Sequence, residues 1–307
     1  MDMKIIGIDA GGTKTSMKLF SWAGQPLDHI TLESCHPLRK GVAAMGRILL
    51  EGVHLLEERN HLKEKEAILS FGLAGYGKEP TLRQAMEEVL ANIFQGYDYK
   101  IHNDGEVAHA GAFVSGEGIL LIAGTGSIAL GSGEEGLLRA GGFGPSFGDE
   151  GSAFWLAKTL LQRLTHMEDG RRRKTLLYGL VLQRLHLRDA YGLLGYVEET
   201  LGNQRENIAS LAVLLKEACD LGDTEALEIY EKGAQHLAAL IKALTARGVG
   251  AKDVAYYGGV FQGGDYVLKP LEKALGADYR VVPPVEGPEY GAYLLAKRKF
   301  APSMESR

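Results

Sequence analysis

Cysteine, long apolar runs and concentrated positive charge are all scarce in this sequence of 307 residues. Its two cysteines, Cys35 and Cys219, stand far apart and form no Cys-x-x-Cys motif. This spacing argues against a disulfide framework, a zinc site and an iron–sulfur ligand set. Two isolated thiols are typical of a reducing compartment, so we expect a cytoplasmic protein.

No segment approaches the roughly 20 apolar residues of a membrane-spanning helix. The first apolar run is too short for a signal peptide, so we expect none. A net charge of −5 provides no basic surface for nucleic acid. The basic run at residues 171–174 is interpreted as a solvated loop, with a site for an acidic partner as the alternative. We therefore expect neither a membrane nor a nucleic acid as partner.

Glycine is abundant, with 41 residues concentrated where apolar runs end. Three turns combine glycine with polar residues: DAGGT at 9–13, NDG at 103–105 and GTGS at 124–127. Each follows a short run typical of a β-strand. A glycine turn leaves backbone N–H groups free and lets phosphate oxygens approach closely. An aspartate there can bind Mg²⁺ through water or accept a proton from an alcohol.

The periodicity of apolar residues predicts an α/β protein with mixed sheets covered by helices. The predicted strands are 4–8, 16–20, 27–34, 67–71, 99–102, 118–123, 128–130, 254–257 and 279–282. The predicted helices are 41–59, 80–94, 105–113, 265–275 and 288–300, with residues 155–245 mostly helical. The pattern restarts at residue 118, which suggests a duplicated unit and a boundary near 115–117.

Each motif also has a structural interpretation. The turn after Asp9 can be an ordinary hairpin turn, and it is not a P-loop, because Thr13 rather than glycine precedes Lys14. Asp104 ends a strand just before a helix, so it is either a general base or a helix N-cap. Asp149 or Ser152 can cap the helix that follows them. The crowded glycines at 141–151 favour a ligand pocket there.

Taken together, the segments resemble the N-acetylglucosamine kinase / BadF-BadG-BcrA-BcrD ATPase group of the actin-like, hexokinase-like superfamily. The motifs, in order, are IGIDAGGTKT, GLAG, NDGEVAHAG, IAGTGSIA, GGFGPSFGDEGSAFWLA, YYGGV and YGAYLLA. The resemblance implies two actin-like (ribonuclease H-like) domains around a central ATP/sugar cleft, and a homodimer. The expected domains are 1–116, onto which the C-terminal helix 288–307 packs back, and 117–287 with a helical insertion at about 155–245.

The resemblance also implies roles for individual residues. Asp9 would support Mg²⁺, and Asp104 would be the general base. The residues expected to bind ATP are Gly11, Gly12, Thr13, Lys14, Gly124, Thr125, Gly126, Gly258 and Gly259. The residues expected to contact the sugar are His36, Asn103, Asp104, Gly142, Gly144, Asp149 and Ser152.

The implied reaction is transfer of the γ-phosphate of ATP to the 6-hydroxyl of an amino sugar, N-acetylglucosamine first. Glucosamine, N-acetylmuramic acid and glucose are alternative acceptors. The chain departs from the group at His36, where an asparagine is usual, and at Phe143, where a tryptophan is usual. Both departures concern the choice of sugar. Two further hypotheses are an ATPase activator, disfavoured by the scarcity of cysteine, and a sugar sensor without turnover.

Overall fold

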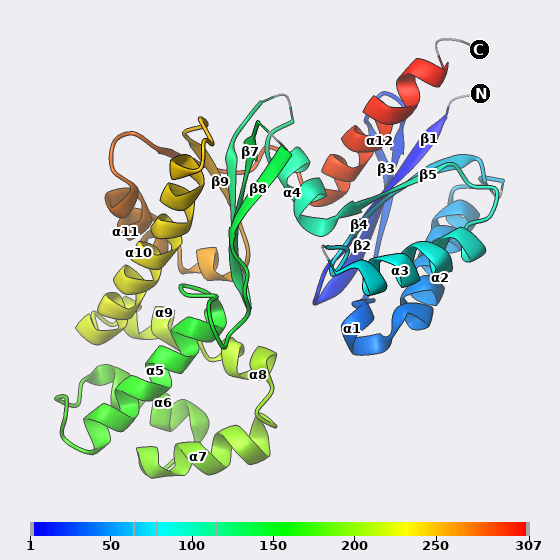
Figure 1. Cartoon of the computed structure of the whole chain (residues 1–307). Coiled ribbons are helices and arrows are strands. Elements are labelled where there is room, and N and C mark those ends of the chain that lie inside the picture. The colour runs from blue at the N-terminus through cyan, green and yellow to red at the C-terminus, as the bar shows by residue number, and fades with distance from the viewer. Residues whose placement is uncertain (1–2, 64, 78, 115, 135, 305–307) are drawn as a thin grey trace. The chain divides into compact units, whose positions relative to one another are not determined.

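The computed structural model describes residues 3–304 except positions 64, 78, 115 and 135. The chain divides into two compact units, Met1–Gly116 with Pro284–Arg307, and Glu117–Pro283 (Figure 1). Residue 115 of the expected boundary and residues 305–307 of the expected last helix lie outside the described residues.

The first unit is a mixed five-stranded sheet between two layers of helices. Its strands lie in the order β3-β2-β1-β4-β5, and β1 pairs antiparallel with β2 and parallel with β4. Helices α2 and α3 cover one face, and α4 and α12 cover the other (Figure 1). The elements are β1 (Lys4–Ala10), β2 (Lys14–Ser21), β3 (Pro26–Glu33), α1 (Pro37–Lys40), α2 (Val42–Arg59), β4 (Ala67–Leu73), α3 (Pro80–Ile93), β5 (Tyr99–Asn103), α4 (Asp104–Ala112) and α12 (Pro288–Met304).

Strand β1 shows how the sequence pattern sets the two faces of this sheet. Successive side chains on a strand point to opposite faces. Ile6 and Ile8 belong to the core under α2 and α3, whereas Ile5 belongs to the smaller core under α12. Gly7 and Asp9 therefore share the face of α12. Gly7 lets that helix approach closely, since a Cβ there would overlap the backbone of Glu289.

Gly7→Ala is expected to destabilise the first unit by about 1–3 kcal/mol, because a methyl group would force α12 away from β1. The matched control is Gly77→Ala, since no atom lies within 4 Å of a Cβ built at Gly77. Urea denaturation of both variants measures the difference. Equal free energies of unfolding for the two variants would contradict the close approach of α12.

The second unit repeats the strand connectivity of the first and adds a large helical segment. Its order is β10-β9-β6-β7-β8, with β6 antiparallel to β7 and parallel to β9. Its strands are β6 (Ile119–Ala123), β7 (Ser127–Gly133), β8 (Gly136–Gly141), β9 (Asp253–Tyr257) and β10 (Arg280–Val282). Its helices are α5 (Ala153–Glu168), α6 (Leu176–Leu185), η1 (Ala190–Gly192), α7 (Leu193–Gly195), η2 (Tyr196–Thr200), α8 (Arg205–Ser210), α9 (Val213–Asp220), α10 (Thr224–Ala246), η3 (Gly259–Gly263) and α11 (Asp265–Leu275).

The α/β prediction and the repeated unit are confirmed by these two sheets. Strand β8 was not predicted. It lies at the edge of its sheet, none of its residues is buried, and glycines stand at both its ends. Its sequence therefore lacks the strict alternation of a half-buried strand. Hydrogen bonding to β7, and not the sequence pattern, makes this segment a strand.

Three of the four basic residues at 171–174 have partners within the chain. Arg171 pairs with Asp169, Arg172 with Glu225, and Lys174 with Glu168. Arg163, which is buried, also pairs with Glu225. Arg172 therefore links this run to α10, and ion pairs compensate most of the charge of the run.

Candidate active site

The first glycine turn joins the carboxyl end of β1, the central strand of the first sheet, to β2. It closes with a hydrogen bond from the Gly11 amide to the Lys14 carbonyl at 3.0 Å. The Ser34 hydroxyl donates to the Gly11 carbonyl at 3.0 Å and supports the turn from the side. A Cβ at Gly12 would meet no atom within 4 Å, so this part of the turn faces open space. An incoming anion can approach its backbone here.

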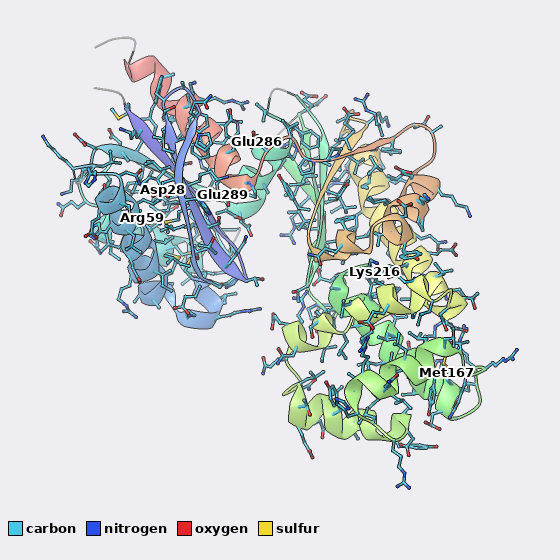
Figure 2. The ribbon with its side chains drawn as sticks, turned by 180° about the vertical axis from the view of Figure 1, so that it is seen from behind. Asp28, Arg59, Met167, Lys216, Glu286 and Glu289 are labelled. Atoms are coloured by element: carbon cyan, nitrogen blue, oxygen red, sulfur yellow. The ribbon has the colours of Figure 1, made fainter. Side chains whose placement is uncertain are left out.

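Asp9, the last polar residue before this turn, lies among other carboxylates. Burial, followed by the charges of Glu289 and Asp104, raises the pKa of Asp9 to about 7, against the opposing charge of Lys14. Glu289 stands in the first turn of α12 and accepts a hydrogen bond from the Ser16 hydroxyl on β2. Figure 2 shows Glu289 where α12 meets the strands of this sheet. The concentration of negative charge favours a cation at this edge.

Asp104 is the first residue of α4, directly after β5. Burial raises the pKa of Asp104, and the Gly105 amide, which donates to its Oδ1 at 3.0 Å, partly offsets the rise. Strands β1, β4 and β5 run parallel, so their carboxyl ends meet at one edge. This topology brings Asp104 near Asp9, although 95 positions of sequence separate residues 9 and 104.

The N-cap of α4 is Asn103, so the interpretation of Asp104 as N-cap is wrong. The Asn103 side chain accepts from the Gly105 amide at 2.9 Å, and Glu106 completes a capping box. Asn103 Nδ2 also donates to the Tyr76 carbonyl at 3.1 Å. Because Asn103 satisfies the helix end, the carboxylate of Asp104 is not required for capping.

His36 is the N-cap of the short helix α1, and it interacts electrostatically with Asp104. Its Nδ1 accepts a hydrogen bond from the Leu38 amide at 3.2 Å. Burial lowers the pKa of His36, Arg39 lowers it further, and the Asp104 carboxylate opposes them. A neutral imidazole accepting at Nδ1 carries its proton on Nε2, which leaves a donor for a hydroxyl.

The second glycine turn joins β6 to β7, the position that the first turn holds in its own sheet. The Gly124 amide donates to the Gly126 carbonyl at 2.9 Å, and the Gly124 carbonyl accepts from the Ala153 amide at 2.8 Å. Gly258 directly follows β9 and lies next to this turn with φ of +115°, and a Cβ there would overlap the Ala123 carbonyl. Gly259 begins η3. The second unit thus brings together the glycines expected to bind phosphate and adenosine.

The glycine-rich segment before α5 is a loop that is exposed at residues 143 and 145–147 and buried at Asp149 and Ser152. Gly142 and Gly144 have φ of +71° and +84°. Asp149 is 5% exposed and pairs with Arg205. The Ser152 hydroxyl is fully buried and accepts from the Trp155 amide at 3.2 Å, so Ser152 caps α5. Asp149 is therefore not the cap, and both side chains are occupied within the chain.

Three residues of these sites were missed by sequence reasoning. Ser34 supports the first turn, Glu289 faces Asp9, and Arg205 holds the second turn through the Thr125 carbonyl at 3.0 Å. Glu289 stands just before the YGAYLLA motif, and a carboxylate between two nearby glycines, Gly287 and Gly291, was an available signal. Arg205 lies within the helical segment, where no motif marks it.

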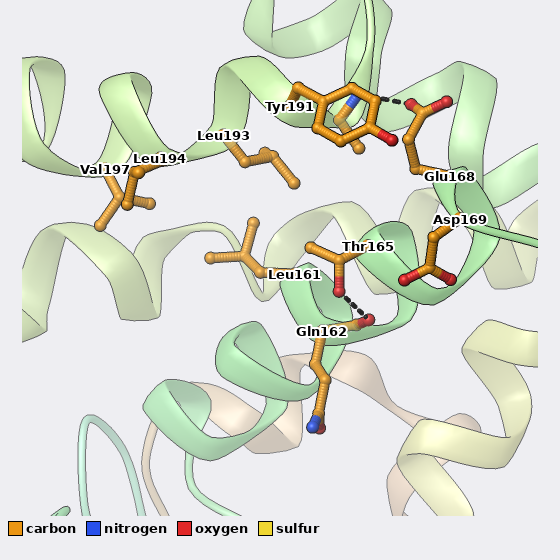
Figure 3. A pocket seen from close by; sticks show the side chains of 10 residues that line it. Leu161, Gln162, Thr165, Glu168, Asp169, Tyr191, Leu193, Leu194 and Val197 are labelled. Carbon is orange, nitrogen blue, oxygen red and sulfur yellow. Dashed lines mark hydrogen bonds between the residues drawn. The ribbon is translucent and has the colours of Figure 1, made fainter. Parts of the chain in front are cut away.

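A separate cavity of about 510 Å³ lies in the helical segment of the second unit (Figure 3). Its lining comes from Leu161, Gln162, Thr165, Glu168, Asp169, Ala190, Tyr191, Leu193, Leu194 and Val197. Glu168 is occupied there by Tyr178, Lys174 and the Ala190 amide, which hold its pKa at about 2. The glycine turn contacts the first residue of α5, and this cavity lies along the second half of that helix. The cavity therefore forms no part of the candidate site.

Among the residues that the structure describes, no group of three or more His, Cys, Asp or Glu side chains is arranged to hold a metal ion. Nor does any helix in the described part of the chain have the length and apolar character to cross a membrane.

Two mixed sheets of identical connectivity, each with a glycine turn between its first pair of antiparallel strands, define an actin-like ATPase fold. The chain belongs to the BadF/BadG/BcrA/BcrD ATPase family, whose sequence profile matches residues 6–296.

Similar proteins cover almost the whole chain. An N-acetylmuramic acid/N-acetylglucosamine kinase of Clostridium acetobutylicum is 29% identical over 95% of this chain and 98% of its own. An N-acetyl-D-glucosamine kinase of Dictyostelium discoideum is 28% identical over 95% and 97%. A crystal structure from Chromobacterium violaceum, provisionally assigned as an N-acetylglucosamine kinase, is 26% identical with a TM-score of 0.78 over 96% and 99%.

Proposed function

We propose that this chain is an ATP-dependent kinase that phosphorylates the 6-hydroxyl of an amino sugar, with N-acetylglucosamine as the leading acceptor. The observation that carries the proposal is Asp104, a carboxylate with a raised pKa that interacts electrostatically with His36 and Asp9 and is not needed as a helix cap. The similarity to two sugar kinases over nearly full length supports it.

In the proposed reaction Asp104 accepts the proton of the 6-hydroxyl as that oxygen bonds to the γ-phosphorus. The bond from the γ-phosphorus to the bridging oxygen breaks, and ADP leaves. A base is most effective when its pKa lies near the working pH. The burial that raises the pKa of Asp104 serves this purpose. His36 beside it would orient a neighbouring hydroxyl.

The remaining turn residues bind the nucleotide in this proposal. Backbone amides near Gly12 and Thr13 and the Lys14 ammonium would contact β- and γ-phosphate oxygens. In the second unit, Thr125 and Gly126 would bind phosphate oxygens, and adenosine would lie against Gly258 and Gly259. Phosphoryl transfer depends mainly on positioning and neutralised charge, which these groups supply.

The donor set at Asp9 fits Mg²⁺. The ion favours hard oxygen ligands, and it usually takes one or two carboxylates together with water and substrate phosphates. Asp9 and Glu289 are carboxylates that repel each other, and the charge of Lys14 opposes the resulting rise in the pKa of Asp9. When bound, the ion would neutralise developing charge on the phosphates. Asp9 would hold it, directly or through water, with Glu289 nearby.

Asp149 and Ser152 would shape the sugar pocket as its supporting frame, since both side chains are engaged within the chain. Gly142, Gly144 and Asn103 stay predictions as sugar contacts. The homodimer and the cytoplasmic location also remain proposals. The ATPase-activator alternative is disfavoured because both cysteines are buried and burial raises the pKa of each thiol, to about 12 at Cys219.

A coupled ADP-release assay with Mg·ATP across a panel of sugars tests the proposal. The panel contains N-acetylglucosamine, glucosamine, N-acetylmuramic acid, N-acetylmannosamine, glucose and a blank. We expect strong stimulation by N-acetylglucosamine. Stimulation by a different hexose would keep the kinase and change its acceptor. ADP release without sugar dependence, or no release at all, would favour an ATPase activator or a sugar sensor.

A further inference from the structure

Arg205 contacts two segments of the second unit that are far from it in sequence, the second glycine turn and the glycine-rich loop before α5. It is the first residue of α8, within the helical segment. Its Nη2 donates to the Thr125 carbonyl at 3.0 Å and also to the Asp149 carboxylate. The central carbon of its guanidinium lies 5.9 Å from the centre of the Phe154 ring. One side chain thus contacts the second glycine turn and the segment before α5.

Asp149 extends this contact to the other end of the turn. Its Oδ1 accepts from the Ser127 amide at 3.4 Å, while its Oδ2 accepts from Arg205. Asp149 has φ of +61°, an uncommon conformation for a residue with a side chain. Together Arg205 and Asp149 hold a carbonyl and an amide on either side of Gly126.

The absence of a side chain at Gly126 is what admits this pair. A Cβ there would lie 2.7 Å from Arg205 Nη2 and 2.9 Å from Asp149 Oδ2. The peptide between Thr125 and Gly126 is planar, and none of the described peptide bonds is cis. Because its carbonyl points to Arg205, its N–H points in the opposite direction. By holding the Thr125 carbonyl, Arg205 therefore orients the Gly126 N–H away from its own side of the turn.

We propose that Arg205 is a positioning residue for phosphate binding, which acts by turning the Gly126 amide outward toward the phosphates of ATP. This inference rests on the proposed function of the turn. Its effect should be confined to the phosphates, because Gly258 and Gly259 rather than Arg205 would contact adenosine. The ratio of ATP affinity to adenosine affinity is therefore the quantity that isolates it.

The test measures the binding of ATP and of adenosine to the full-length chain by calorimetry, with Mg²⁺ present. For Arg205→Gln we expect ATP affinity to fall about tenfold or more, as for loss of a charge-assisted hydrogen-bond network. Adenosine affinity should change less than twofold. The control is Arg184→Gln, which removes a surface ion pair with Glu217 in the same unit. It should change neither affinity.

A conservative variant keeps the test valid if Arg205→Gln fails to fold, since removing the arginine leaves a buried carboxylate unpaired. Arg205→Lys keeps the charge near Asp149 but lacks the planar fork of donors. It should lose part of the ATP affinity and retain that for adenosine. Equal loss of ATP and adenosine binding, or an unchanged ratio, in the folded variant would overturn the inference. A wild-type chain that binds no ATP would instead refute the proposed function.

Discussion

Asp104→Asn is expected to lower the turnover number of the sugar-dependent reaction by about 10²–10⁴-fold, roughly 3–5 kcal/mol of activation free energy. Asparagine cannot accept the proton of the attacking hydroxyl. It can still accept the hydrogen bond from the Gly105 amide, and Asn103 continues to cap α4. The variant should therefore fold normally and bind ATP within about twofold of wild type.

Steady-state kinetics and ATP calorimetry on the same preparations measure the two expectations. Asp98→Asn, an exposed substitution in the same unit, is the matched control and should leave both unchanged. A turnover number for Asp104→Asn near that of wild type would mean that another group is the base. If the variant lost both turnover and the ability to bind ATP, the substitution would have disturbed the fold or the nucleotide site.

Asp9→Asn is expected to raise the free energy of unfolding at pH 8, by up to about 4 kcal/mol. The folded chain raises the pKa of Asp9 from 3.8 to about 7, so the folded state binds its proton more tightly than the unfolded state. The stabilisation of the folded state by the proton on Asp9 is therefore complete below pH 4 and is lost as the pH rises toward 7. Asparagine carries no charge at any of these pH values, so the variant does not lose this stabilisation as the pH rises.

Urea denaturation at pH 4, 6 and 8 without nucleotide or Mg²⁺ checks this expectation. The advantage of Asp9→Asn over wild type should be small at pH 4 and should grow toward pH 8. Asp98→Asn, whose side chain is exposed, should show no such trend. Parallel pH profiles for Asp9→Asn and wild type would contradict the electrostatic account. Ionisation of Asp9 would then not lower the free energy of unfolding, and a role of Asp9 in cation binding would need other evidence.

The two substitutions also separate two roles for carboxylates at the same sheet edge. Asp104 lies next to a helix N-terminus and beside His36, while Asp9 faces Glu289. The dipole at the start of α4 favours negative charge on Asp104. The charges of Glu289 and Asp104 add to burial in raising the pKa of Asp9, so we expect Asp9 to depend more on an external cation.

Most strands and helices could be predicted because they rest on local patterns. The apolar run that contains Ile5, Ile6 and Ile8 and the glycine turn after Asp9 are visible in a short window of sequence. Edge strand β8 could not be predicted, since its pairing rather than its pattern defines it. The N-cap of α4 was misjudged for a related reason. Asn103 and Asp104 are both good caps, and backbone geometry decides between them.

The sequence by itself determined the order of elements, the two glycine turns and the chemistry-bearing aspartates, because each depends on neighbouring residues. Only the tertiary structure decided which groups meet. Glu289 reaches Asp9 because Gly7 admits α12 against β1, and Arg205 reaches Thr125 because Gly126 leaves room for its guanidinium. Such contacts join residues far apart along the chain. They depend on how helices pack on sheets, and no local pattern encodes that packing.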